Sequence, residues 1–256
     1  MHDPELPGSL REVADHQPYP LVFATVSGAH LYGFPSADSD WDLRASHVLP
    51  AREVLSMRPT RDTIDESRDD RDQGGLELDL VSHDVGKFFK LMLKKNGYVL
   101  EQLHSPIVVK TTPAHQTLRE IADGVVTRFH ADHYLGFAAT QWKLFNKGEP
   151  RVKPLLYLYR VLLTGLHLMR TGSVEANLAR LNEEEQLPWL DELIALKIAG
   201  DERQTLANVD IDFHQRQYHR LREMLERERD RTSLPEHPTK EAVDALDALL
   251  VELRLG

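Results

Sequence analysis

The sequence has no cysteine in its 256 residues, and none of its hydrophobic runs is long. The missing thiols exclude disulfide bridges, thiolate zinc sites and cysteine nucleophiles. No run approaches the roughly 20 apolar residues that a membrane-spanning helix needs. The first residues, Met1 to Glu5, also lack the basic and apolar regions of a secretory signal. We therefore expect a soluble, cytoplasmic protein with no membrane partner.

Positive charge is scarce as well. The chain has 31 Lys and Arg residues but 41 Asp and Glu residues, which gives a net charge of −10. This balance argues against sequence-independent binding to long stretches of nucleic acid, which depends on many Lys and Arg contacts. Two basic clusters run against the trend, Lys87–Lys95 and Lys143–Arg160. Such a cluster can bind a nucleotide triphosphate or the end of a nucleic acid, or it can be a solvated helix face. For any single lysine the solvated face is the simpler interpretation.

The pattern of the chain changes near Thr111–Pro113, and with 41% hydrophobic residues it can bury a core. Before this point strands alternate with short helices, and after it nearly every segment favours helix. We therefore predict an α+β fold, with a small mixed sheet flanked by helices in residues 1–112 and an all-helical domain in residues 113–256.

The individual elements follow from hydrophobic periodicity and from helix start and stop signals. The expected strands are Leu21–Ser27, Trp41–His47, Leu76–Val81 and Ile107–Lys110, with helices at Ser9–His16 and Val85–Lys95. The charged stretch Arg61–Asp72, ending in Gly74-Gly75, is expected to be an exposed loop or hairpin. The expected helices of the second part are Ala114–Asp123, His130–Lys147, Val152–Met169, Val174–Glu183, Leu187–Ile198, Phe213–Arg231 and Lys240–Leu253.

Two aspartates, Asp40 and Asp42, stand one residue apart at the expected strand Trp41–His47. Residues i and i+2 of an extended strand project from the same face. Two neighbouring carboxylates repel each other unless a cation lies between them, and hard oxygen ligands suit Mg²⁺. We therefore expect the pair to bind Mg²⁺ or Mn²⁺ and to be catalytic.

A third carboxylate is expected on the alternating strand Leu76–Val81. Asp79 is the best candidate, and Glu77 on the same face is the runner-up. Asp84 is better explained as a helix N-cap. Two metal ions held by Asp40, Asp42 and Asp79 would suit phosphoryl or nucleotidyl transfer, and the third carboxylate could also accept the proton of an attacking hydroxyl.

The residues around the aspartates suit phosphate binding. Gly28 permits a tight turn and a close backbone approach, while Ser27 or Ser39 could donate hydrogen bonds to phosphate oxygens. Arg44 lies two residues after Asp42 and shares its face. It could bind a phosphate in bidentate fashion, or it could simply offset the acidic cluster.

These motifs resemble the polymerase-beta-like nucleotidyltransferase superfamily, and within it the predicted nucleotidyltransferases associated with bacterial RNA-repair operons. The resemblance rests first on Ser27-Gly28-Ala29, Gly33-Phe34, Ser36, Asp38-Ser39-Asp40, Asp42 and Arg44. It continues through Lys87–Asn96, Leu100-Glu101, Ser105-Pro106 and Lys153-Pro-Leu-Leu-Tyr157-x-x-Arg160, and it fades beyond Gly172.

The resemblance implies metal-dependent transfer of a nucleoside monophosphate from an NTP to an acceptor hydroxyl, with an RNA (tRNA-like) 3′ end as the expected acceptor. By the same analogy Lys153, Tyr157 and Arg160 would bind the triphosphate, and Lys95 joins them from the first basic cluster. One position departs from the pattern, because Ala29 replaces a serine whose hydroxyl is expected on the triphosphate. Ser27, Ser39 or backbone N–H groups would have to replace that contact.

Two alternatives stay open at this level. The acceptor could be a protein side chain or a small hydroxyl compound, which the net acidity favours. The chain could also bind a nucleotide without turnover, which Ala29 favours and the three carboxylates oppose. The sequence does not indicate an oligomeric state or a preferred nucleotide.

Overall fold

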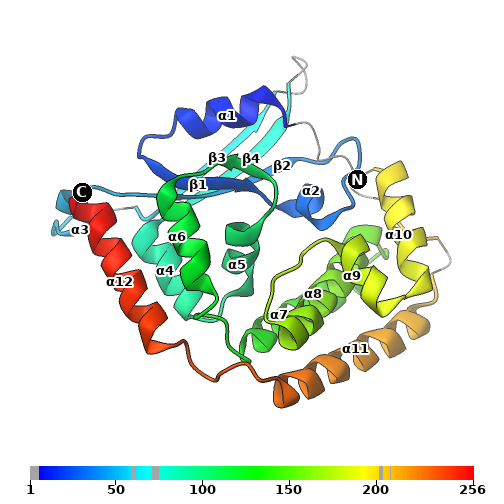
Figure 1. Cartoon of the computed structure of the whole chain (residues 1–256). Helices are drawn as coiled ribbons and strands as arrows, with labels where there is room; N and C mark the ends of the chain where they lie inside the picture. The colour runs from blue at the N-terminus through cyan, green and yellow to red at the C-terminus, as the bar shows by residue number, and fades with distance from the viewer. Residues whose placement is uncertain (1–5, 59–60, 71–74, 202–203, 208) are drawn as a thin grey trace. The chain divides into compact units, whose positions relative to one another are not determined.

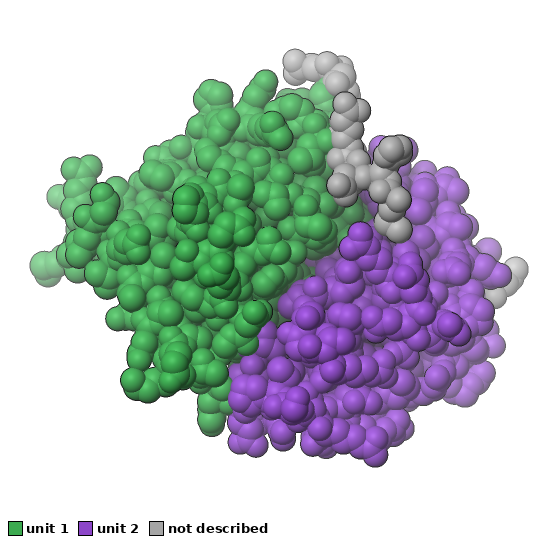
Figure 2. Space-filling model, viewed as in Figure 1, with its two compact units in different colours: residues 1–31, 40–125, 237–256 green, residues 32–39, 126–236 purple. Residues whose placement is uncertain are grey.

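A computed structural model describes residues 6–58, 61–70, 75–201, 204–207 and 209–256 of the chain (Figure 1). The chain forms two compact units, and neither is continuous in sequence (Figure 2). We call residues 1–31, 40–125 and 237–256 the sheet unit, and residues 32–39 and 126–236 the helical unit. The segment after residue 112 was assigned to a helical domain from the sequence, but its first and last helices belong to the sheet unit.

A five-stranded mixed sheet is the framework of the sheet unit, in the order β3-β4-β2-β1-β5. The strands are β1 (Leu21–Val26), β2 (Trp41–His47), β3 (Thr63–Asp69), β4 (Glu77–Asp84) and β5 (Val108–Lys110). Neighbours pair antiparallel except β2 and β4, which are parallel. The four predicted strands are confirmed, and the α+β prediction with them.

Strand β3 lies in the charged stretch that was expected to be a loop or hairpin. It pairs with β4 from Thr63↔His83 to Asp69↔Glu77, so the hairpin interpretation is confirmed and the loop interpretation is wrong for residues 63–69. An edge strand can carry many charges because one of its sides faces solvent. Residues 71–74, including Gly74 of the expected turn, lie outside the described residues.

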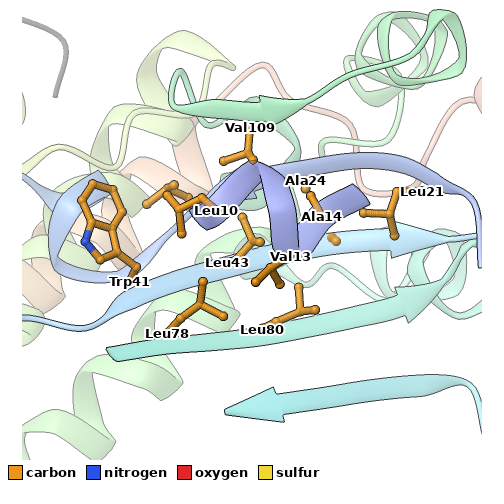
Figure 3. Packing of buried hydrophobic residues seen from close by; sticks show 12 residues of the cluster. Leu10, Val13, Ala14, Leu21, Ala24, Trp41, Leu43, Leu78, Leu80 and Val109 are labelled. Atoms are coloured by element: carbon orange, nitrogen blue, oxygen red, sulfur yellow. The ribbon is translucent and has the colours of Figure 1, made fainter. Parts of the chain in front are cut away.

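Helices cover both faces of the sheet. The helices of this unit are α1 (Gly8–Asp15), α2 (Gly28–Tyr32), α3 (Ala51–Val54), α4 (Val85–Leu93), α5 (Gly97–His104), α6 (Pro113–Ala122) and α12 (Lys240–Leu255). On one face, Leu10 and Val13 of α1 pack into a core with Leu43 and Leu80 of the sheet (Figure 3). On the other face, the ring of Phe23 packs against Phe88 of α4 and His115 of α6.

Helices α3 and α5 were not expected from the sequence. The expected helix Val85–Lys95 ends just before Asn96, and α4 does end there, at Leu93. However, the side chain of Asn96 accepts a hydrogen bond from the Tyr98 backbone N–H and thereby caps the start of α5. One polar residue therefore serves as a boundary for two consecutive helices.

The helical unit contains α7 (His130–Phe145), α8 (Val152–Thr171), α9 (Leu178–Glu185), α10 (Pro188–Ala199) and α11 (Ile211–Arg231). Helix α8 is its central element and is buried along most of its length. A Cβ at Gly165 would lie 2.8 Å from Leu225 of α11, so a glycine there allows the two helices to pack closely. The helices predicted in this part of the chain are confirmed, with ends shifted by a few residues. In the described part of the chain, no helix has the length and apolar character needed to cross a membrane.

Candidate active site on strands β2 and β4

Asp42 and Asp79 are direct neighbours across the parallel pair of β2 and β4. Side chains alternate along a strand, so Trp41 and Leu43 join the core under α1 while Asp42 projects from the opposite face. The side chain of Asp42 is 18% exposed and that of Asp79 is 37% exposed. The fold thus brings together two of the three predicted carboxylates on a partly open surface. We call Asp42, Asp79 and Arg44 the acidic centre.

Arg44 is the cation of the acidic centre. Its Nη2 donates to Asp42 Oδ1 at 2.5 Å and to Asp79 Oδ2 at 3.2 Å. Its Nη1 donates to the carbonyl oxygens of Leu43 and Asp79, and its Nε donates to the Tyr98 hydroxyl at 3.0 Å. A guanidinium has five N–H groups, and five acceptors surround this one. The structure therefore favours the second interpretation of Arg44, in which it offsets the acidic cluster.

The pKa of Arg44 shows how strongly the surroundings favour its charge. Burial alone would lower this pKa, but Tyr98, Asp42 and Asp79 together raise it above its ordinary value. An arginine that is ion-paired and hydrogen-bonded on every side is rigid, so it fixes the orientation of both carboxylates.

The donor set of the acidic centre fits a divalent cation. One oxygen from each carboxylate already lies within hydrogen-bond distance of a single cationic nitrogen, so the two oxygens converge on one point. Carboxylate oxygens are the ligands that Mg²⁺ prefers. Among the described residues, however, no group of three or more His, Asp or Glu is arranged to share one ion. Two carboxylates converge here, and a site for two metal ions stays a prediction.

Because Gly28 has no side chain, it leaves room for the carboxylate of Asp42 beside the turn. Its φ angle is +61°, and an added Cβ would lie 1.8 Å from Asp42 Oδ2. The backbone N–H of Ser27 donates to the carbonyl of Asp42 at 2.8 Å, which ties the turn to the strand. The predicted close approach of the backbone at Gly28 is therefore present, and the group it approaches is the Asp42 carboxylate.

The remaining predicted carboxylates lie in different positions. Asp40 precedes β2 by one residue, so the strand carries Asp42 but not Asp40. Glu77 is on β4 and is paired in register with Asp69 of β3. Asp84 accepts a hydrogen bond from the Gly86 N–H and caps α4, which confirms its interpretation as an N-cap. The catalytic roles assigned to Asp40, Asp42 and Asp79 stay predictions.

Lys95 has a positive φ angle of 61°, which is unusual for a residue with a side chain. It lies between the end of α4 and the Asn96 cap of α5, and α5 carries the Tyr98 that binds Arg44. The Asn96 N–H donates to the Leu91 carbonyl and the Lys95 N–H donates to the Met92 carbonyl, so the left-handed conformation of Lys95 closes the end of α4. The role of Lys95 in nucleotide binding stays a prediction.

Ser39 belongs to the helical unit and lies in a turn with Ser36. The Ser39 Oγ accepts from the Ser36 N–H at 3.0 Å and lies 3.1 Å from the Ser36 Oγ. Lys197 of α10, which is fully buried, donates to the Ser36 Oγ at 2.5 Å. In this structure Ser39 is a turn residue, and no local pattern predicts that a lysine 161 positions away from Ser36 supports that turn.

The three predicted residues of α8 lie around aromatic rings. The guanidinium carbon of Arg160 lies 3.9 Å from the centre of the Tyr32 ring, and Arg160 is only 2% exposed. The ring of Tyr157 contacts the rings of Tyr32 and Phe34 edge-on. The Nζ of Lys153 lies 5.7 Å from the centre of the Tyr157 ring. We call Tyr32, Phe34, Lys153, Tyr157 and Arg160 the aromatic cluster.

Two residues that support the acidic centre were not predicted. Tyr98 binds Arg44, and the Ser67 Oγ donates to Asp79 Oδ1 at 2.9 Å. Ser67 stands opposite Asp79 in the register of β3 and β4. Recognition of the stretch as an edge strand would have placed Ser67 beside Asp79, whereas nothing in the sequence indicates the partner of Tyr98.

The chain is similar in sequence to proteins of an archaeon and of a bacterium. A protein of Methanocaldococcus jannaschii, the uncharacterized protein MJ0002, is 29% identical over 157 residues, which cover 61% of this chain and 63% of that protein. The uncharacterized protein YcgL of Bacillus subtilis is 27% identical over 211 residues, which cover 79% of each chain. The present chain thus spans less than two thirds of the archaeal relative.

A solved structure, the nucleotidyltransferase-like protein of Exiguobacterium sibiricum 255-15, matches with a TM-score of 0.32 and 12% identity. This match covers 94% of the present chain and 76% of the other, but its score is too low to support an argument. The family model RlaP, described as the RNA repair pathway DNA polymerase beta family, matches residues 3–252. The chain therefore belongs to the RNA repair pathway DNA polymerase beta family.

Proposed function

We propose that the protein is a metal-dependent nucleotidyltransferase that moves a nucleoside monophosphate from an NTP to the 3′-hydroxyl of an RNA. The observation that carries the proposal is the convergence of the Asp42 and Asp79 carboxylates on one cationic nitrogen. Membership in a polymerase-beta family of RNA repair supports the same reaction class.

Asp42 and Asp79 would hold Mg²⁺ or Mn²⁺, with Asp40 joining from the residue before β2. The bound ion would neutralise charge on the α-phosphate and make the acceptor hydroxyl more acidic. In the transfer itself, the acceptor oxygen forms a bond to the α-phosphorus, and the bond between that phosphorus and the bridging oxygen to the β-phosphate breaks. Pyrophosphate leaves, and the hydroxyl proton passes to the Asp79 carboxylate.

The triphosphate would be bound by the backbone of the Gly28 turn and by side chains with partly exposed polar groups. Gly28 lets the backbone approach closely, and Ser27 before it is fully buried, so in this proposal it supports the turn. Lys95, Lys153 and Tyr157 are all partly exposed, which suits direct contact with phosphate or base. Arg160 and Arg44 are buried, so in this proposal they support the site by holding the aromatic cluster and the acidic centre in shape.

Labelled nucleotides provide the test. The protein is incubated with each of the four α-³²P-NTPs, with Mg²⁺ or Mn²⁺, and with an RNA that ends in a 3′-hydroxyl. We expect a labelled, longer RNA and one pyrophosphate released per nucleotide added. The same RNA with a 3′-phosphate should give no product. Nucleotide binding without incorporation into any RNA would contradict the RNA acceptor.

A second acceptor class is favoured by one observation, the net charge of −10. An acidic protein repels polyanions at long range, so a protein hydroxyl or a small hydroxyl compound is the alternative acceptor for the same chemistry. Mass spectrometry of reaction mixtures would then reveal a nucleoside monophosphate adduct on protein or small molecule, and none on RNA.

A further inference from the structure

A groove of about 850 Å³ lies in the sheet unit between α3, α4 and the C-terminal helix α12. Its apolar lining comes from Leu49 before α3, Leu91 of α4 and Leu250 of α12. Neither Asp42 nor Asp79 is among the described residues that line it. The groove is therefore separate from the acidic centre.

Exposed apolar side chains gather at this groove. Of the ten large hydrophobic residues that are exposed in the described part of the chain, four line the groove, namely Val54, Leu55, Val251 and Leu255. A fifth, Met57, lies in the chain between two lining residues and is fully exposed. Scattered exposed hydrophobics are normal, but a contiguous group marks an interaction site.

Helix α12 has two apolar faces. Leu246 and Leu249 are buried, as expected for the face that packs on its own unit. Val251 and Leu255, four residues apart, are 49% and 76% exposed. A surface helix of a globular protein needs one apolar stripe, so a second stripe predicts a further packing partner.

The groove is also firmly built. Arg254 of α12 forms a buried ion pair with Asp84 at 2.6 Å, and it donates to the Leu49 carbonyl at 2.5 Å. The other oxygen of Asp84 accepts from the Leu49 N–H. A Cβ on Gly86 would lie 3.3 Å from Arg254 and 3.9 Å from Leu250, so the end of α12 lies directly against the start of α4. The exposed stripe is therefore held in place and is not a fraying helix end.

The net charge beside the groove differs between its two sides. Arg58, Lys90 and Lys94 are exposed on the side of α3 and α4. Among the described residues, the acids that line this side are Asp62, which pairs with Lys87, Asp84, which pairs with Arg254, and Glu53. Asp247 and Glu252 are exposed on α12. A surface with cations on one side of an apolar strip and anions on the other is complementary to itself after a two-fold rotation.

We propose that this surface binds a second copy of the chain, so that α12 of each copy packs over α3 and α4 of the other. The exposed stripe of α12 would enter the partner's groove, and Asp247 and Glu252 would meet the partner's basic residues. An RNA occupant fits less well, because no aromatic side chain is among the described lining residues to stack on bases. The acidic residues of α12 would also repel phosphates.

Sedimentation equilibrium and mass photometry of the full chain test the proposal. We expect a dimer at micromolar concentration that weakens as salt is raised. Val251→Asp together with Leu255→Asp should raise the dissociation constant at least a hundredfold while the thermal unfolding curve stays cooperative. A chain that is monomeric at about 100 μM, or a dimer that this double variant leaves unchanged, would overturn the proposal.

A charge-reversal series adds a test that does not depend on apolar burial. Lys90→Glu with Lys94→Glu should weaken the dimer at least tenfold, because both helices are then acidic. Adding Asp247→Lys and Glu252→Lys to the same chain should restore the affinity to within about threefold. A quadruple variant that stays as weak as the double variant would contradict this pairing of helices.

RNA binding and nucleotidyl transfer are measured on the same variants. If the lysine changes abolish RNA binding and leave the oligomeric state unchanged, the surface binds RNA and the dimer proposal is wrong. The groove residues lie outside the acidic centre, so a failure of the dimer and a failure of the proposed activity can be told apart.

Discussion

The acidic centre and the aromatic cluster each contain a buried arginine, but the two arginines have different surroundings. Arg44 of the sheet unit is enclosed by oxygen acceptors, including the carboxylates of Asp42 and Asp79. Arg160 of the helical unit lies against the face of the Tyr32 ring. In the first case the cation positions acids, and in the second it positions aromatic rings. Both arginines were predicted to bind the nucleotide, with charge compensation as the alternative for Arg44; nucleotide binding stays a prediction for both, and the contacts seen here position neighbouring side chains.

We infer from this contrast that the two units have different functions. Substitutions in the acidic centre should affect chemistry and metal binding, whereas substitutions in the aromatic cluster should affect nucleotide binding. The predictions below test that division, beginning with the largest expected effect.

Asp42→Asn and Asp79→Asn should each reduce nucleotidyl transfer at least about a thousandfold, which corresponds to ~4 kcal/mol of transition-state stabilisation. The amide keeps the size of the side chain but removes the charge that would hold a divalent ion. Glu77→Gln is the matched control on the same strand, and its rate should fall less than about threefold. Steady-state rates with α-labelled NTP measure all three, and equal losses in Asp79→Asn and Glu77→Gln would show that the third carboxylate is misassigned.

Gly28→Ala should destabilise the protein by ~2–4 kcal/mol and abolish transfer. The added methyl group would collide with Asp42 Oδ2, and the residue would keep a φ angle of +61° that alanine rarely adopts. Gly136→Ala in α7 is the control, because its Cβ meets no atom within 4 Å. That change should stabilise the helical unit by about 0.5–1 kcal/mol. Urea unfolding measures both free energies.

Arg44→Met should lower stability by ~1–3 kcal/mol, because it leaves two partly buried carboxylates without their cation. A divalent ion can then relieve the repulsion, so 5–10 mM Mn²⁺ should raise the Tm of this variant more than that of the unchanged protein. Arg160→Met should also lose stability, but its Tm should respond to Mn²⁺ no more than that of the unchanged protein. Equal metal responses in the two variants would remove the distinction between the two arginines.

Lys153→Ala should raise KM for the NTP about tenfold and change kcat little, since its ammonium is predicted to bind the triphosphate and not to take part in chemistry. Lys147→Ala, on an exposed residue of the same basic stretch, is the control and should leave both constants within about twofold. A drop in kcat with an unchanged KM for Lys153→Ala would place this lysine in the chemical step.

The smallest effect concerns pH. Burial, with help from Arg119, lowers the pKa of His104 in the sheet unit to about 4, and burial beside Arg160 lowers the pKa of His133 in the helical unit. The unfolded chain binds these protons near pH 6.5 and the folded chain does not, so stability is retained above pH 6.5 and lost as the pH falls toward 4. His104→Gln should reduce the loss between pH 7 and pH 5 by about 1–2 kcal/mol. Urea titrations at both pH values provide the measurement, and an unchanged loss would mean that His104 is protonated in the folded state.

Much of the acidic centre was predictable because its signals are local. The alternation of Leu78, Asp79 and Leu80 predicts a strand with Asp79 on one face, and the same argument applies to Asp42 within Trp41–His47. The parallel pairing of those strands then makes Asp42 and Asp79 neighbours. Asp40 lies one residue before the strand, which begins at Trp41 as predicted, so strand alternation does not place the Asp40 side chain.

The contacts that could not be predicted join residues far apart in sequence. Ser67 reaches Asp79 only because an unusually charged stretch forms an edge strand. Arg254 and Asp84 are 170 positions apart, and Lys197 and Ser36 are 161 apart. Periodicity and capping rules describe single elements. They predicted the helix Lys240–Leu253, but they could not predict that this helix is part of the sheet unit.

Titration of Mn²⁺ in the presence of a non-hydrolysable NTP analogue tests the central claim most directly, with bound ion followed by electron paramagnetic resonance. The account predicts saturable binding to the unchanged protein, a loss of affinity of at least tenfold in Asp42→Asn and in Asp79→Asn, and little change in Glu77→Gln. Equal Mn²⁺ affinity in the unchanged protein and in both aspartate variants would contradict it, because the ion would then bind somewhere other than between β2 and β4.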